Sequence, residues 1–91
     1  MPLFDLLVMK TQGWWNHRVS PRKDFRAKED GDVADVDALL DRAIEEDVSY
    51  QEERGVGRHT SEFMDWALLL SRRFVSLHRR REKWRAIEFP G

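Results

Sequence analysis

The side chains best suited to catalysis in this sequence lie next to one another in one short run. His59, Thr60, Ser61 and Glu62 place an imidazole beside two hydroxyl groups and a carboxylate. Nucleophilic catalysis also requires an orienting acid and an oxyanion site, which adjacent residues rarely supply. Thr60 and Ser61 are better suited to capping the N-terminus of a helix. We therefore expect no catalytic residue and no enzymatic activity.

The residues that could bind a metal ion or a phosphate group do not have the spacing that such sites require. Residues 30–37 are spaced like a calcium loop, but Ala34 and Asp35 occupy the positions that need a ligand and a glycine. The three histidines are far apart along the chain, and the absence of cysteine excludes thiolate ligands and disulfides. The glycine pair in residues 55–57 lacks the third glycine and preceding strand of a phosphate loop. We expect no metal and no cofactor.

Macromolecular binding is the chemistry that remains, and it is concentrated in residues 61–86. At about 100° per residue, an aromatic and aliphatic face lies opposite a row of basic residues. This basic ridge consists of Arg72, Arg73, Arg79, Arg80 and Lys83, with Arg81 and Arg85 nearby. Regularly spaced arginines on a helix can follow nucleic-acid phosphates or meet an acidic protein.

A second candidate contact is the adjacent pair Trp14 and Trp15, followed by Arg18. Neighbouring residues point about 100° apart on a helix and to opposite faces on a strand, so one tryptophan can lie at the surface. A surface tryptophan beside an arginine is typical of a binding hot spot. The alternative is that both tryptophans close a small core. We assign these three residues, with the basic ridge, as partner-binding residues.

Length and composition place these residues in one small domain. The 91 residues are 41% hydrophobic and 36% charged, with a net charge of −1. The charge is distributed unevenly: residues 1–28 carry +4, residues 29–65 carry −10 and residues 66–91 carry +5. The acidic block can neutralise the basic ends in the folded chain, or one cationic surface can stay free.

The helical pattern predicts a mainly α domain, residues 1–91, built on an antiparallel helical hairpin. Residues 32–54 predict an acidic amphipathic helix that ends at a glycine, and residues 61–86 predict one long, unbroken basic helix. Residues 20–31 form a basic and polar linker, and residues 87–91 form a tail that folds back or projects outward.

The apolar N-terminal segment, residues 1–19, is ambiguous on periodicity alone. Its leucine and methionine content favours a short helix, but two strands around Gly13 would give a β-hairpin and an α+β fold. The segment is interrupted by Asp5 and has no preceding basic region, unlike a signal peptide. No apolar run approaches the roughly 18 residues of a membrane span. We expect a cytoplasmic protein.

The long basic helix carries more apolar surface than one helix can cover. Met64, Leu68 and Val75 form a second stripe, which indicates contact with another segment or an oligomeric partner. We therefore expect a small non-enzymatic regulator, inhibitor, adaptor or assembly component that docks on a larger protein. The alternative is a nucleic-acid-binding protein that uses the basic ridge. Small cysteine-free chains of this kind are common among phage accessory and virion proteins, which is an association without a structural argument.

Overall fold

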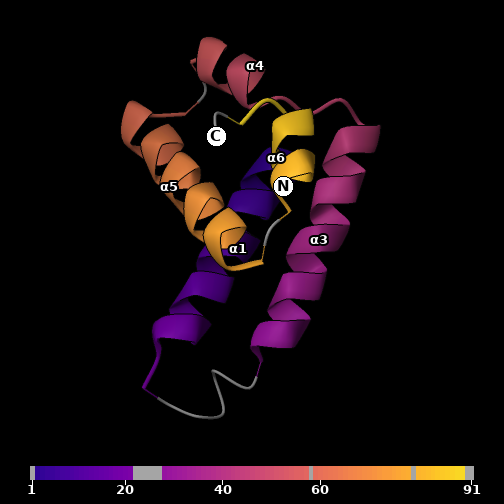
Figure 1. Cartoon of the computed structure of the whole chain (residues 1–91). Helices are drawn as coiled ribbons and strands as arrows, with labels where there is room; N and C mark the ends of the chain where they lie inside the picture. The colour runs from indigo at the N-terminus through magenta and orange to yellow at the C-terminus, as the bar shows by residue number, and fades with distance from the viewer. Residues whose placement is uncertain (1, 22–27, 58, 79, 90–91) are drawn as a thin grey trace.

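The computed structural model describes residues 2–21, 28–57, 59–78 and 80–89. These residues form the helices α1 (Leu3–Val19), α3 (Glu29–Glu45), α4 (Tyr50–Gly55), α5 (Ser61–His78) and α6 (Arg81–Ala86), as Figure 1 shows. Among them there is no strand, so the predicted mainly α domain is confirmed and the β-hairpin alternative is wrong. No helix in this part of the chain is long and apolar enough to cross a membrane.

The helical hairpin is formed by α1 and α3, which run antiparallel (Figure 1). The sequence predicts instead that the acidic helix pairs with the basic one. In the structure α5 packs on α1, and the basic segment packs on α3 through α6. The N-terminal segment is therefore a central helix of the domain.

Helix α1 buries residues that recur at helical spacing along one face. The buried face consists of Phe4, Leu7, Val8, Thr11 and Trp14. The Thr11 hydroxyl donates a hydrogen bond to the Leu7 carbonyl at 2.7 Å, which satisfies a polar group inside the core. Trp14 is 0% exposed, and its ring packs against Phe74 of α5 at a centroid distance of 5.0 Å. Helix α1 therefore carries one wall of the core along its length.

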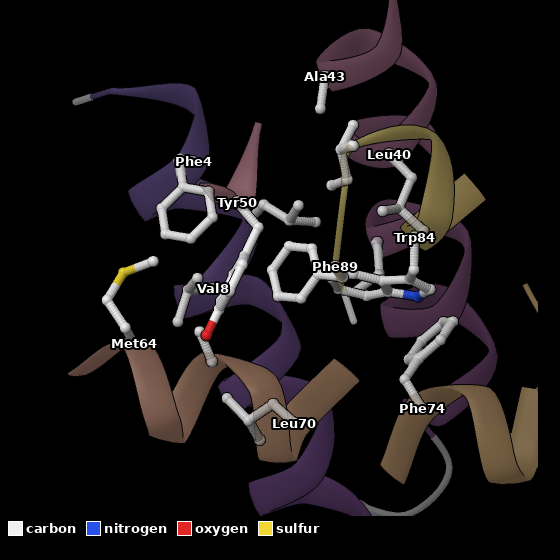
Figure 2. Close-up of a cluster of buried hydrophobic side chains, with 14 of the residues drawn as sticks. Phe4, Val8, Leu40, Ala43, Tyr50, Met64, Leu70, Phe74, Trp84 and Phe89 are labelled. Atoms are coloured by element: carbon white, nitrogen blue, oxygen red, sulfur yellow. The ribbon is translucent and has the colours of Figure 1, made fainter. Parts of the chain in front are cut away.

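Residues 87–89 of the C-terminal tail return to the core. Figure 2 shows Phe89 between Tyr50 and Trp84, with ring centroids 4.7 Å and 4.9 Å away. The Tyr50 N–H donates to the Ile87 carbonyl at 2.8 Å, which fixes α4 to this tail. Burying one large apolar side chain stabilises a fold by about 1.5–3 kcal/mol, so the tail is an integral part of the domain.

The acidic helix is interrupted, so the prediction of one helix over residues 32–54 is wrong. Asp47 adopts the left-handed conformation with φ 54°, and the Val48 N–H donates to the Ala43 carbonyl at 3.0 Å. This bond is the six-to-one bond of a Schellman motif, which ends α3. Ser49 then caps α4 by accepting a hydrogen bond from the Glu52 N–H. The apolar spacing continues through the break, which is why the pattern conceals it.

The basic helix is also interrupted, so the prediction of an unbroken helix over residues 61–86 is wrong. Helix α5 ends at His78 and α6 begins at Arg81. Ten residues along a straight helix span about 15 Å, yet the rings of Phe74 and Trp84 have centroids only 6.0 Å apart. Breaking the helix lets Trp84 turn back onto Phe74 and bury its ring.

The carboxylate of Glu29 connects α1, α3 and α5. Its Oε2 accepts hydrogen bonds from Arg18 Nη1 at 2.5 Å and Trp14 Nε1 at 3.3 Å, and it lies 3.0 Å from His78 Nε2. Burial opposes ionisation of this carboxyl, but its hydrogen bonds to Arg18, His78 and Trp14 outweigh burial and lower the pKa of Glu29. The ionised carboxylate therefore stabilises the junction of these helices.

Replacing Asp47 tests the left-handed end of α3. We expect Asp47→Gly to raise the free energy of unfolding by about 0.5–1 kcal/mol, because glycine adopts positive φ without the strain of a Cβ. Asp47→Ala is the matched control, since it removes the same side chain and keeps the Cβ. Urea denaturation followed by circular dichroism measures both. A glycine variant less stable than the alanine variant would contradict this account.

Replacing Glu29 tests the junction through its pH dependence. A folded-state pKa below the ordinary glutamate value, about 4.3, gives stabilisation that is present above that value and lost as pH falls through the lowered pKa. We expect Glu29→Gln to lower the free energy of unfolding by about 1–2 kcal/mol at pH 7. The difference in free energy of unfolding between the variant and the unchanged protein should shrink steadily as the pH falls below the ordinary pKa of glutamate. Asp30→Asn, which removes an exposed acid from the same turn, should show little of either effect.

Candidate functional site

The two tryptophans assigned from the sequence differ in position. Trp14 has no exposed surface, so a partner cannot reach it in this fold, and we leave it out of the candidate site. Trp15 is half-buried, and the guanidinium carbon of Arg73 lies 4.3 Å from its ring centroid. The same guanidinium lies 5.7 Å from the ring of Trp66. Arg73 is therefore held between two aromatic side chains from α1 and α5.

The basic ridge is divided by the acidic helix. Arg80 Nε lies 3.0 Å from Asp37 Oδ1, and Lys83 Nζ lies 2.8 Å from the same oxygen and 2.9 Å from Asp41 Oδ1. The hydrogen bond from Lys83 lowers the pKa of Asp37, and the hydrogen bonds to Asp37 and Asp41 raise the pKa of Lys83. These two cations, predicted as contacts, are already paired within the chain.

The other assigned arginines have separate positions. Arg18 is engaged by Glu29, and Arg79 lies outside the described residues. Arg72 is exposed, and so is the neighbouring Arg81. Within the part of the chain that the structure describes, neither guanidinium of this exposed pair has a hydrogen bond or an ion pair. Arg72 and Arg81 are therefore cations available to an external group.

Arg72 and Ser76 line two adjacent hollows on this side of the molecule. The first, about 350 Å³, lies toward α1 and is also lined by Trp15, Arg73 and Leu77. The second, about 330 Å³, lies between α5 and α6. We define the tryptophan–arginine surface as the residues Trp15, Trp66, Arg72, Arg73 and Leu77.

Sequence reasoning missed two members of this surface. Helical spacing places Trp66 and Leu77 on the aromatic and aliphatic face of residues 61–86, the face suited to the core. In the structure Trp66 is half-buried and Leu77 is 43% exposed. Leu77 is exposed because α5 ends one residue later and α6 turns away. No local signal in the sequence marks that turn.

The second apolar stripe, expected to meet either another segment of this chain or an oligomeric partner, is mostly covered within this chain. Met64 is 1% exposed, and Leu68 and Val75 pack half-buried against the core. The buried face of α5 is therefore rotated toward Met64 relative to the predicted one. This stripe does not provide the surplus surface on which the expectation of an oligomer depended.

The residues considered for chemistry have structural partners. The Thr60 hydroxyl accepts a hydrogen bond from the Phe63 N–H at 3.0 Å, so the predicted capping role is confirmed. His59 Nε2 lies 3.0 Å from Asp5 Oδ1 and 3.2 Å from Glu53 Oε2. Among the described residues, no group of three or more histidine, aspartate and glutamate side chains could hold a metal ion.

Comparison with known proteins gives no assignment. No protein-family model matches this chain, and neither the curated proteins nor the solved structures contain a match. The local geometry alone must therefore indicate a function. It places paired and unpaired cations close together in sequence, and the unpaired ones can meet a new ligand without first losing an internal contact.

Removing the acids of α3 tests whether they mask the basic ridge. We expect Asp37→Asn with Asp41→Asn to raise affinity for a short fluorescent DNA duplex about threefold to tenfold at about 50 mM salt, because Arg80 and Lys83 become free. Fluorescence anisotropy measures the change. The control, Asp30→Asn with Glu45→Gln, removes two exposed charges from the same helix. Equal gains in the two variants would show that net charge alone matters.

Proposed function

We propose that this chain is a small non-enzymatic docking domain that binds a larger protein through the tryptophan–arginine surface. The main support for this proposal is the position of Arg73, which is stacked on Trp15 beside Trp66. Next to it lie the exposed Leu77 and the unpaired Arg72. Aromatic residues and arginine are enriched in the energetic centres of protein interfaces, which supports a protein partner. A regulator, inhibitor, adaptor or assembly component would use such a surface.

The stacked arginine is suited to recognition because its position is set before a partner arrives. A guanidinium on an aromatic face keeps its N–H donors at its edge, where they can meet a carboxylate. Fixing the side chain in advance lowers the conformational entropy lost on binding. No carboxylate in the described part of the chain pairs with Arg73. An acidic patch on the partner would complement it.

A nucleic-acid partner is the weaker candidate. Phosphate binding needs several free cations in a row, since each neutralised phosphate adds to affinity. Of the predicted ridge, Arg80 and Lys83 contact Asp37. Helix α5, which carries Arg72 and Arg73, ends at His78. The later basic residues therefore do not continue a row of cations along the same helix. These observations favour protein docking.

Site-specific crosslinking tests this proposal. A photo-crosslinking amino acid is placed at Leu77 in the full chain, and the captured protein is identified by mass spectrometry after nuclease treatment. With that partner purified, we expect Arg73→Ala to weaken binding about tenfold or more. Arg42→Ala, an exposed arginine on α3, should change it less than about twofold.

The same experiment can exclude the proposal. Loss of the crosslink on nuclease treatment would indicate nucleic acid rather than protein. Full affinity in the Arg73→Ala variant would exclude the stacked arginine as a contact. Circular dichroism of each variant separates a lost contact from a lost fold, and Trp15→Ala serves as a second contact variant.

A further inference from the structure

The hollow between α5 and α6 is a half-open groove of about 330 Å³. It adjoins the tryptophan–arginine surface, since Arg72, a member of that surface, and Ser76 line both this hollow and the one beside Trp15. Its lining residues are Ser71, Arg72, Val75, Ser76, Arg81, Trp84, Arg85 and Phe89. An apolar wall and a basic rim therefore meet in one groove, and none of the described residues that line it is acidic.

The basic rim comes from two helices. Arg72 belongs to α5 and Arg81 to α6, and neither has an internal carboxylate partner among the described residues. The contrast with Arg80 is informative, because this neighbour of Arg81 is paired with Asp37. The turn between α5 and α6 thus directs one arginine to the acidic helix and leaves the next one at the groove.

We propose that this groove binds an acidic segment of the docked protein, with one apolar side chain against Val75 and Trp84. The carboxylates of the segment would lie between Arg72 and Arg81, whose planar guanidinium groups match carboxylate geometry. This inference rests on the proposed function, and it names the chemistry of the partner. The half-open shape suits a peptide segment better than a small molecule, which needs most of its surface enclosed.

The same groove is poorly suited to nucleic acid. Single strands bind by stacking bases on open aromatic faces along a basic track. Here Trp84 and Phe89 are each only 3% exposed, so neither ring presents an open face on which a base could stack. An apolar side chain flanked by carboxylates fits both the wall and the rim.

Titration with a defined peptide tests the groove directly. The probe is an acetylated and amidated pentapeptide with one phenylalanine flanked by two aspartates on each side. It is added to the isotope-labelled full chain, and backbone amide shifts are followed by NMR. We expect the shifts to concentrate in residues 71–76 and 81–89, with a dissociation constant below about 1 mM.

Variants of the rim identify the groups responsible. We expect Arg72→Ala and Arg81→Ala each to weaken the peptide about fivefold, because each removes one charge-assisted contact. The double lysine variant, Arg72→Lys with Arg81→Lys, should retain part of the affinity because it keeps both charges. Arg42→Ala is the matched control and should leave the affinity unchanged. The side chains of Arg72 and Arg81 are both exposed and have no hydrogen bond or ion pair among the described residues, so the fold should persist, as circular dichroism can verify.

Changes in the probe test each half of the proposed chemistry. Replacing its phenylalanine by alanine removes the contact with the apolar wall, and replacing its aspartates by asparagine removes the contact with the rim. Both changes should weaken binding. Binding that is unchanged by the loss of Arg72 and Arg81, or tighter binding of a short single-stranded DNA at the same residues, would overturn the proposal.

The two proposals fail in distinguishable ways. A peptide that does not bind, while the nuclease-resistant crosslink at Leu77 persists, excludes the groove and leaves the docking surface intact. Peptide binding at the groove without any crosslink at Leu77 excludes the tryptophan–arginine surface instead. In that case the groove is a separate acidic-segment site.

Discussion

The ionised carboxylate of Glu29 is the contact on which the arrangement of the long helices depends. A buried indole N–H without an acceptor costs free energy, and Glu29 supplies an acceptor to Trp14. The same oxygen lies 3.0 Å from His78 at the end of α5 and 2.5 Å from Arg18 at the end of α1. Because these contacts fix the two helix ends together, they also set which face of α5 lies beside Trp15.

The turn between α5 and α6 then determines which basic residues pair with the acidic helix α3. Once α6 folds back onto α3, Arg80 and Lys83 meet Asp37. Arg72, on α5, is exposed and has no ion pair among the residues that the structure describes. The driving force for the turn is burial of Trp84 against Phe74 and Phe89 rather than charge pairing, because exposed ion pairs are individually weak. Trp84 is imperfectly satisfied: its indole N–H has no acceptor in the described part of the chain, which costs about 1–3 kcal/mol.

Helix propensity and capping preferences predicted the parts of the fold that depend on neighbouring residues in the sequence. The leucine and methionine content of the N-terminal segment favoured a helix where the apolar spacing alone was ambiguous, and Leu3–Val19 form α1. Thr60 caps α5 as expected. The two helix breaks were not predictable in this way. Val48 and Trp84 continue the apolar spacing past each break, and Asp47 adopts a left-handed conformation that is usually left to glycine. Only the contacts of the folded chain show why ending each helix lowers the free energy.

The sequence by itself determined a single mainly helical domain, its division into basic, acidic and basic segments, and the aromatic and arginine residues from which a binding surface can be built. These follow from residue type and spacing along the chain. The tertiary structure alone decided which cations are available and which tryptophan is buried. The reason is that pairing and burial depend on distances between residues far apart in sequence: Trp84 can reach Phe74 only if the helix ends, and that ending brings Lys83 to Asp37.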